Sequence, residues 1–139
     1  MKDALIDTGP CIALFDRDDH FHNEIKSFLK NYRGHLITSW AVITETLHML
    51  DFDYRVQLDF LKWLERGALE VAGPERKDLN RIIELTEKYH DLPIDFADAT
   101  LLAIAERRQI SSVISIDNDF QVYRTAYGKP LEMLFQKKR

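Results

Sequence analysis

Short apolar runs alternate with longer amphipathic stretches along almost the whole sequence, and this alternation limits the fold more than any other feature. The apolar runs predict strands at residues 4–6, 35–38, 68–71, 112–116 and, less clearly, 131–135. Between them, apolar residues recur every three or four positions, which is the spacing of a helix with one buried face. Strands that alternate with helices form a mostly parallel sheet covered on both faces. We therefore expect an α/β fold.

Proline, glycine and capping residues mark the ends of the expected helices. They predict helices at residues 10–15, from Asp18 or Asp19 to before Gly34, and at 40–50, 54–66, 74–89 and 96–108. The helix at 40–50 is apolar nearly all round, which is typical of a buried helix. Its residue Glu45 is therefore expected inside the protein or at the lip of a cleft. Trp40 and Trp63 are expected in the core rather than as platforms for nucleic-acid bases.

Length and composition narrow the function classes. The 139 residues suit one domain, expected at 1–135, followed by a short basic tail at 136–139. The formal net charge of −4 argues against a protein that coats DNA, and it fits a basic protein partner. Cys11 is the only cysteine, so no internal disulfide can form. No apolar run approaches the roughly 20 residues of a membrane span, and we expect a cytoplasmic protein without membrane contact.

Carboxylates stand where a parallel sheet presents ligand-binding residues. Asp7 follows the first predicted strand, and Asp117 follows the run at 112–116. Asp95 and Asp98 lie three residues apart at the start of a helix, so they share a face. Glu45 belongs to the helix after the second strand. Because ligands bind beyond the carboxyl ends of parallel strands, we expect these acids to meet at one edge of the sheet.

Such a cluster requires cations. Two carboxylates about 4 Å apart repel each other by roughly 4 kcal/mol at an effective dielectric constant near 20. Hard oxygen ligands select Mg²⁺ or Mn²⁺, which retain waters and bind phosphate oxygens of a substrate. One or two such ions activate water for attack on a phosphodiester. The cluster therefore predicts metal-assisted hydrolysis of phosphodiester bonds.

Most of these acids also have a structural explanation. Helix capping or attraction to a helix dipole could account for several side chains: Asp7 or Thr8, Asp95, Asp98, and Asp117 or Asp119. Glu45 is the hardest to explain in this way, because a buried carboxylate without a partner is costly. The acids therefore indicate a site only through their placement together.

Four segments in the expected order carry a family resemblance. They are residues 5–10, Thr38-Ser39 leading to Thr44-Glu45, residues 95–99 and residues 115–120. With these segments the sequence resembles a PIN domain of the kind found in VapC-type toxins of toxin–antitoxin pairs. The resemblance spans nearly the whole chain. Each segment alone is weakly specific, whereas four in this order are fairly specific.

The resemblance implies more than the residues do alone. It implies an α/β/α sandwich around a parallel sheet, and acids that bind Mg²⁺ or Mn²⁺ to cleave RNA. By resemblance, Asp7, Asp98 and Asp117 are metal-ligand positions, and Glu45 is the acid of the second motif. Thr8 resembles the hydroxyl residue that orients the first aspartate or a bound water, and Asp95 and Asp119 are additional acids. VapC-like proteins commonly form homodimers and are inhibited by an antitoxin that inserts a basic segment into the acidic site.

We therefore expect a metal-dependent endoribonuclease, as the toxin of a toxin–antitoxin pair. The alternatives are a PIN-fold protein of RNA processing and a non-catalytic module that binds RNA or protein. A phosphatase of the haloacid-dehalogenase kind would need a second aspartate two residues after Asp7, where this chain has Gly9.

Overall fold

One parallel sheet forms the centre of the protein. A computed structural model describes residues 2–137, and its strands are β1 (Ala4–Ile6), β2 (Leu36–Thr38), β3 (Glu70–Val71), β4 (Ser112–Ile114) and β5 (Glu132–Met133). Their order across the sheet is β3-β2-β1-β4-β5, and every neighbouring pair is parallel. All three residues of β1 are fully buried, as expected for the central strand.

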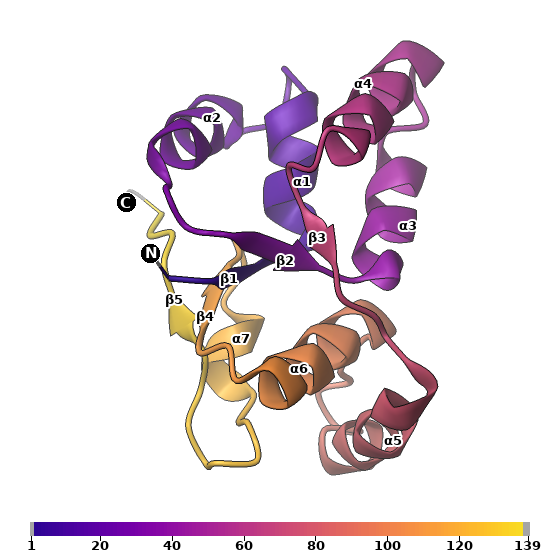
Figure 1. The fold of residues 1–139 in the computed structure, drawn as a ribbon, viewed down its shortest axis with the longest axis vertical. Helices are drawn as coiled ribbons and strands as arrows, with labels where there is room; N and C mark the ends of the chain where they lie inside the picture. Colours follow the sequence, from indigo (N-terminus) through magenta and orange to yellow (C-terminus); the bar gives the residue numbers. More distant parts are fainter. Residues whose placement is uncertain (1, 138–139) are drawn as a thin grey trace.

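Helices cover both faces of this sheet. They are α1 (Thr8–Phe15), α2 (His22–Asn31), α3 (Trp40–Met49), α4 (Tyr54–Glu65), α5 (Leu79–Lys88), α6 (Phe96–Arg108) and α7 (Asp119–Val122), with a 3₁₀ turn at Arg76–Asp78. Figure 1 shows α1 to α4 on one side of the sheet and α5, α6 and α7 on the other. The predicted α/β fold, with its parallel sheet between two helical layers, is confirmed.

The helix α6 begins and ends at the predicted residues, Phe96 and Arg108. Asp95 caps its start by accepting a hydrogen bond from the backbone N–H of Asp98, and Gln109 ends it in a left-handed conformation. Every residue from Ala97 to Ala105 is buried. Since most of these side chains are small or aliphatic, the helix packs closely while keeping Asp98 inside the protein.

Other element boundaries differ from the predictions. The strand expected at 68–71 is shorter, and the helix expected at 74–89 is divided into the 3₁₀ turn and α5. Glu75 and Asp78 form a capping box at the start of the turn, and Asp78 also accepts hydrogen bonds from Arg107. These bonds fix the turn, and α5 follows it directly.

The prediction that α3 is buried all round is wrong. Only Val42, Ile43 and Thr46 are buried within the helix, and Glu45 is exposed. The reason is that α3 packs against α1 and α6, so one side of it faces solvent. Trp40 is exposed as well, whereas Trp63 is half-buried and packs edge-on against Phe15, as expected of a core residue.

Two expectations concern the ends of the chain and the membrane. The predicted basic tail at 136–139 lies partly outside the described residues, which end at 137. Among the helices of the described chain, none is long and apolar enough to cross a membrane.

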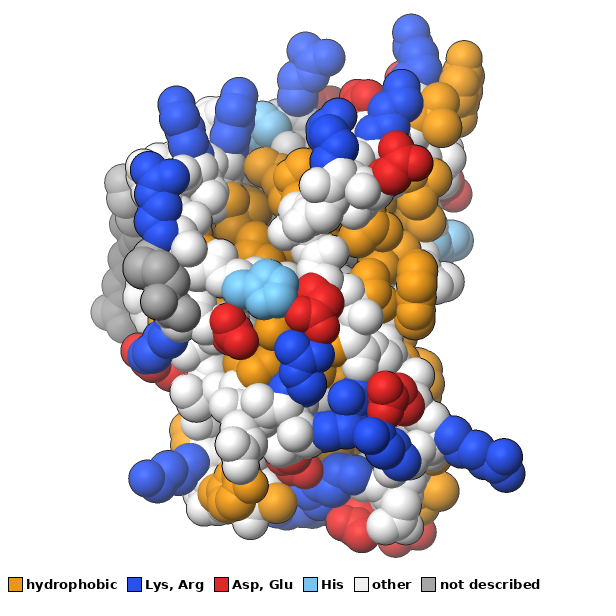
Figure 2. All heavy atoms as spheres, viewed as in Figure 1, with side chains coloured by type: hydrophobic (Ala, Val, Ile, Leu, Met, Phe, Trp, Pro, Cys, Tyr) orange, Lys and Arg blue, Asp and Glu red, His pale blue; other side chains and the backbone are white. Residues whose placement is uncertain are grey.

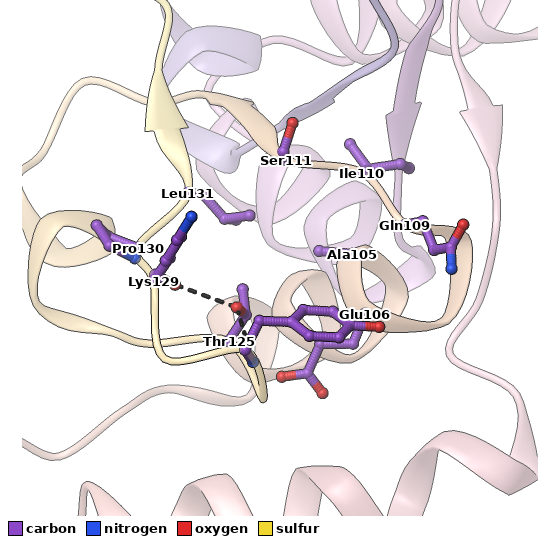
Figure 3. A pocket seen from close by; sticks show the side chains of 10 residues that line it. Ala105, Glu106, Gln109, Ile110, Ser111, Thr125, Lys129, Pro130 and Leu131 are labelled. Atoms are coloured by element: carbon purple, nitrogen blue, oxygen red, sulfur yellow. Dashed lines mark hydrogen bonds between the residues drawn. The ribbon is translucent and has the colours of Figure 1, made fainter.

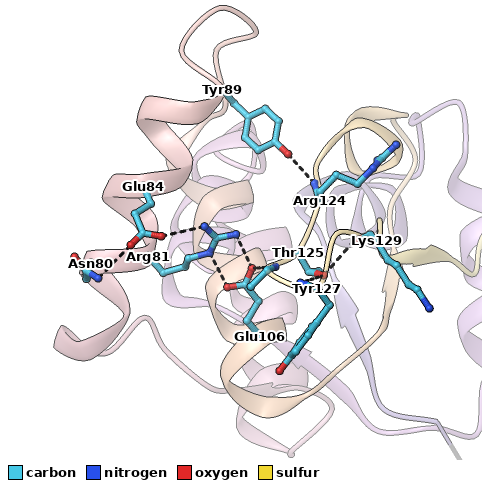
Figure 4. Close-up of polar contacts among 10 residues, drawn as sticks. Asn80, Arg81, Glu84, Tyr89, Glu106, Arg124, Thr125, Tyr127 and Lys129 are labelled. Atoms are coloured by element: carbon cyan, nitrogen blue, oxygen red, sulfur yellow. Dashed lines mark hydrogen bonds and ion pairs between the residues drawn. The ribbon is translucent and has the colours of Figure 1, made fainter.

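An ion-pair network fastens the loop after α7 to α5 and α6 (Figure 4). Arg81 of α5 donates two hydrogen bonds to Glu106 of α6, at 2.7 and 2.9 Å. Glu106 also accepts a hydrogen bond from the backbone N–H of Ala126 at 2.8 Å. Arg81 has a second, exposed partner in Glu84, at 3.2 Å. The network therefore contains one shielded pair and one solvent-exposed pair around the same guanidinium group.

We predict that Glu106→Gln lowers the free energy of unfolding by about 1–2 kcal/mol, because a shielded bidentate pair loses its charge. Glu84→Gln is the matched control and is expected to change it by less than about 0.5 kcal/mol, because exposed pairs contribute little. Urea denaturation of both variants measures the difference. Equal losses in the two variants would contradict the assignment.

Candidate active site

Two buried aspartates stand at the carboxyl edge of the sheet. Asp7 directly follows β1, and its backbone N–H donates to the carbonyl oxygen of Ile114 in β4 at 3.0 Å. Asp98 lies in the first turn of α6, and only about 5% of it is exposed. Each carboxylate is therefore near the amino end of a helix, where the partial positive charge favours an anion.

The electrostatics of this edge link five aspartates. Burial raises the pKa of Asp7 to about 7, with a further rise from the charge of Asp117. Burial also raises the pKa of Asp98 to about 9, followed by repulsion from Asp7 and Asp95. The pKa of Asp119 is raised by burial and by Asp117. These mutual influences link Asp7, Asp95, Asp98 and Asp117, four of the five acids expected to meet, together with Asp119, and we call these five aspartates the aspartate cluster.

The aspartate cluster has no cationic partner. Within residues 2–137, none of its five members forms an ion pair. No Lys, Arg or His side chain is among the main causes of the pKa shifts of Asp7 and Asp98. On the face of the molecule drawn in Figure 2, Lys and Arg side chains project over α2 and α4 at the top, and others lie beside acidic side chains lower down. The cluster is therefore a local concentration of uncompensated negative charge.

The hydroxyl groups around Asp7 distinguish a site from a helix cap. Asp7 occupies the N-cap position of α1, but its side chain makes no capping hydrogen bond. Its carboxylate instead accepts a hydrogen bond from the buried Ser115 hydroxyl at 3.0 Å. The Thr8 hydroxyl is buried and has no hydrogen-bond partner within the described chain. Capping therefore does not explain Asp7, and an unpaired hydroxyl lies directly beside it.

Two of the other acids, Asp95 and Asp117, do cap a helix start or a turn. Asp95 caps α6 through its bond with the Asp98 N–H, at 2.8 Å. Asp117 accepts a hydrogen bond from the backbone N–H of Asp119 at 3.0 Å, and both residues are exposed. These bonds do not remove their charge from the cluster. Asp95, Asp117 and Asp119 thus form its outer part.

Glu45 is not linked to the aspartate cluster by the electrostatics. It is exposed on α3, and its charge is not among the main causes of the pKa shifts of Asp7 and Asp98. The expectation that Glu45 lies inside the protein is therefore wrong, whereas a place at the lip of a cleft stays a prediction. Its assignment as a metal ligand remains a prediction by resemblance.

Buried hydroxyls beneath the cluster were not predicted from the sequence. Thr38 donates to the carbonyl oxygen of Ile6 at 2.9 Å, directly before Asp7. Thr100 donates to the Ser39 hydroxyl at 2.8 Å, which joins the start of α3 to α6. Thr38 and Ser115 stand at the ends of apolar runs. A hydroxyl residue at the end of an apolar run is the sequence signal that could have revealed these buried groups.

The donor chemistry of the cluster fits a hard divalent cation. The donors are carboxylate oxygens with a hydroxyl beside them, and a bound cation would offset the burial and the repulsion that raise both pKa values. The geometry is less complete, because no three His, Cys, Asp or Glu side chains among residues 2–137 are arranged to hold a metal ion together. Mg²⁺ commonly binds through one or two carboxylates and several waters, so two buried aspartates suffice for it.

A hollow in the protein surface is lined by none of the clustered aspartates. It has a volume of about 370 Å³ and is lined by the end of α6 and the loop at 125–131, including Gln109, Tyr127 and Leu131 (Figure 3). Its one carboxylate, Glu106, is already bonded to Arg81. This hollow therefore offers no comparable chemistry.

We predict that the metal-free protein loses stability as pH rises. Because the folded-state pKa values of Asp7 and Asp98 are raised, the folded protein holds protons that the unfolded chain has released. The free energy of unfolding should fall between about pH 4 and pH 9, and Asp98→Asn should remove part of this fall. At pH 9 we expect this variant to be more stable than wild type by roughly 2–4 kcal/mol.

Chemical denaturation in the presence of a chelator, repeated across this pH range, measures the effect. Asp59→Asn on the exposed side of α4 is the control, and its difference from wild type should not vary with pH. A constant stability gap between Asp98→Asn and wild type from pH 4 to pH 9 would rule out the raised pKa.

Comparison with known proteins supports a family assignment. The PIN domain family matches residues 4–125. Ribonuclease VapC26 of Mycobacterium tuberculosis (strain ATCC 25618 / H37Rv) is 25% identical over 115 residues, covering 81% of this chain and 85% of that protein.

Solved structures share the fold. The crystal structure of Mycobacterium tuberculosis VapC20, described as a sarcin–ricin loop cleaving toxin, matches with a TM-score of 0.79 at 20% identity, over 86% of this chain and 93% of that one. A toxin–antitoxin complex from Klebsiella pneumoniae matches with a TM-score of 0.62 at 19% identity, over 84% and 88% of the two chains. VapBC2 from Rickettsia felis, bound to a DNA fragment from the promoter, matches with a TM-score of 0.60 at 14% identity, over 86% of this chain and 92% of that one.

The family match runs from β1 to the loop after α7 and so includes every member of the aspartate cluster. This protein therefore belongs to the PIN domain family and resembles the VapC ribonuclease toxins.

Proposed function

We propose that this protein is a metal-dependent endoribonuclease and the toxin of a toxin–antitoxin pair. The observation that carries the proposal is the pair of buried, uncompensated carboxylates, Asp7 and Asp98, in a PIN domain. The names of the relatives support it, since one is a ribonuclease and another is described as an RNA-loop-cleaving toxin. The reaction adds water across a P–O bond of RNA and leaves a phosphate monoester and a free hydroxyl.

We assign the binding of Mg²⁺ or Mn²⁺ to Asp7 and Asp98. Asp117 is exposed and is not arranged with them to hold an ion in this structure, and we propose it as a third ligand in the ion-bound protein. Glu45, Asp119 and the Thr8 hydroxyl are further candidates at the rim. When bound, the ion supplies an activated water and neutralises charge on the phosphodiester.

The remaining contributions come from side chains around Asp7 and Asp98. Ser115 fixes the orientation of the Asp7 carboxylate through its hydrogen bond. Asp95 fixes the start of α6, and therefore the position of Asp98, by capping the helix. The Thr8 hydroxyl is free to hold a water or a phosphate oxygen.

One observation favours a second candidate function. Residues 2–137 contain no arrangement of three acidic, His or Cys side chains that holds a metal ion, and Glu45 is exposed. A non-catalytic module that binds RNA or protein on the same fold would need no such arrangement. It predicts binding that is unaffected when the ion is chelated or Asp98 is neutralised.

The proposed antitoxin would carry a basic segment. Among residues 2–137 the aspartate cluster has no cationic partner, so a Lys or Arg from another chain would gain a desolvated ion pair there. Two of the similar structures are complexes of a toxin with its antitoxin, which supports such a partner.

A homodimer is supported by the apolar face of α5. Leu79 and Ile83 are four residues apart on one face of this helix and are both exposed. We predict that Ile83→Glu shifts the protein from dimer to monomer in analytical ultracentrifugation, since a charge would be buried at the contact. A wild-type protein that sediments as a monomer at micromolar concentration would contradict the dimer.

We predict that wild-type protein cleaves single-stranded RNA with Mg²⁺ or Mn²⁺ and not in a chelator. Asp7→Asn and Asp98→Asn should reduce cleavage by on the order of 100-fold or more, because each removes charge that binds the ion. Ser115→Ala should reduce it by about tenfold. A gel assay of end-labelled RNA, with Asp59→Asn as the control acid, measures these rates. Wild-type rates in Asp98→Asn, with folding intact, would refute the proposed site.

A further inference from the structure

Trp40 occupies an unusual position for so large an apolar side chain. It is the first residue of α3, directly after the carboxyl end of β2, and 58% of it is exposed. Its backbone is held in place, because its N–H donates to the carbonyl oxygen of Gly73 at 2.8 Å. A rigidly anchored, exposed indole thus stands at the sheet edge that bears the aspartate cluster.

A second exposed aromatic residue stands at the same edge. Phe96 is the first residue of α6, follows the clustered Asp95, and is 55% exposed. The buried hydrogen bond between Thr100 and Ser39 joins the second turn of α6 to the start of α3. Trp40 and Phe96 are therefore the first residues of two helices that are fixed to each other, at the carboxyl edge of the sheet that also bears the aspartate cluster.

The arginines around Trp40 are already paired with carboxylates. Trp40 lines a hollow of about 320 Å³ together with Gly73, Pro74, two glutamates and two arginines. Both arginines are already paired, Arg107 with Asp78 and Arg108 with Glu70. Because their charges are satisfied, the hollow has no free cation for a phosphate group.

An RNA substrate at this edge needs affinity from its bases. Its phosphates are repelled by the uncompensated carboxylates, and a bound divalent ion offsets only part of that charge. Aromatic side chains stack on any nucleobase, and this stacking does not depend on phosphate contacts. We propose that Trp40 and Phe96 bind single-stranded RNA by stacking on nucleobases next to the phosphate held at the aspartate cluster. This inference rests on the proposed ribonuclease function.

The fluorescence of Trp40 can show whether RNA contacts this side chain. The chain has two tryptophans, and Trp63→Phe leaves Trp40 as the only indole. Asp98→Asn in the same protein prevents cleavage during the titration. The probe is a mixed-sequence RNA of about 12 nucleotides, compared with an abasic strand of the same length. We expect the RNA to quench the fluorescence of Trp40 in a saturable way, and the abasic strand to leave it unchanged.

Fluorescence anisotropy of labelled RNA measures the affinity of the variants. Trp40→Ala should raise the Kd at least about fivefold, Phe96→Ala should raise it similarly, and Trp40→Phe should keep it within about twofold. Tyr54→Ala, which removes an exposed aromatic residue from the start of α4, is the matched control and should have no effect.

The contrary outcomes are distinct. RNA that binds equally to Trp40→Ala and to its parent, without quenching, overturns the stacking proposal alone. Quenching by the abasic strand would mean that Trp40 contacts the backbone, which also overturns it. A change in sedimentation of Trp40→Ala at unchanged RNA affinity would assign the residue to a protein interface. If RNA binds to none of the proteins, including the parent, the proposed function itself fails.

Discussion

The site depends on two carboxylates that the fold buries without a counter-charge. Asp7 follows the central strand and Asp98 sits on the most deeply buried helix, so neither side chain can turn to solvent. Their repulsion opposes folding, and the sheet and α6 must hold them in place by packing. Helix amino ends and the Ser115 hydroxyl offset part of that repulsion. This uncompensated pair is the feature on which the proposed cation site rests.

The hydroxyl network explains how the edge is held together. Thr38 bonds to the end of β1, Ser115 bonds to Asp7, and Thr100 joins α6 to the start of α3. Each bond is buried and links a different pair of elements. The outer aspartates are instead exposed, and Asp95 and Asp117 accept hydrogen bonds only from backbone N–H groups of their own turns. The site therefore combines a buried, bonded centre with an exposed rim.

Much of this could be predicted from the sequence, and the failures share a physical cause. Asp7 and Asp98 were found because strand ends and helix starts are marked locally, by apolar runs and by caps such as Asp95. Glu45 and Trp40 were misplaced because an apolar pattern shows what a helix could bury and not which neighbours it has. The bonds of Ser115 and Thr100 were missed because serine and threonine are common, and their partners lie about 110 and 60 residues away.

The central claim is that Asp7 and Asp98 share a cation site and hold protons when it is empty. Calorimetric titration of Mn²⁺ into chelator-treated protein at pH 7, in buffers of different ionisation enthalpy, counts the protons released on binding. The account predicts release of about one proton per ion, because both carboxyl groups have raised pKa values. It also predicts that Asp98→Asn weakens binding and reduces the release. Binding without proton release, or binding unchanged in Asp98→Asn, would contradict it.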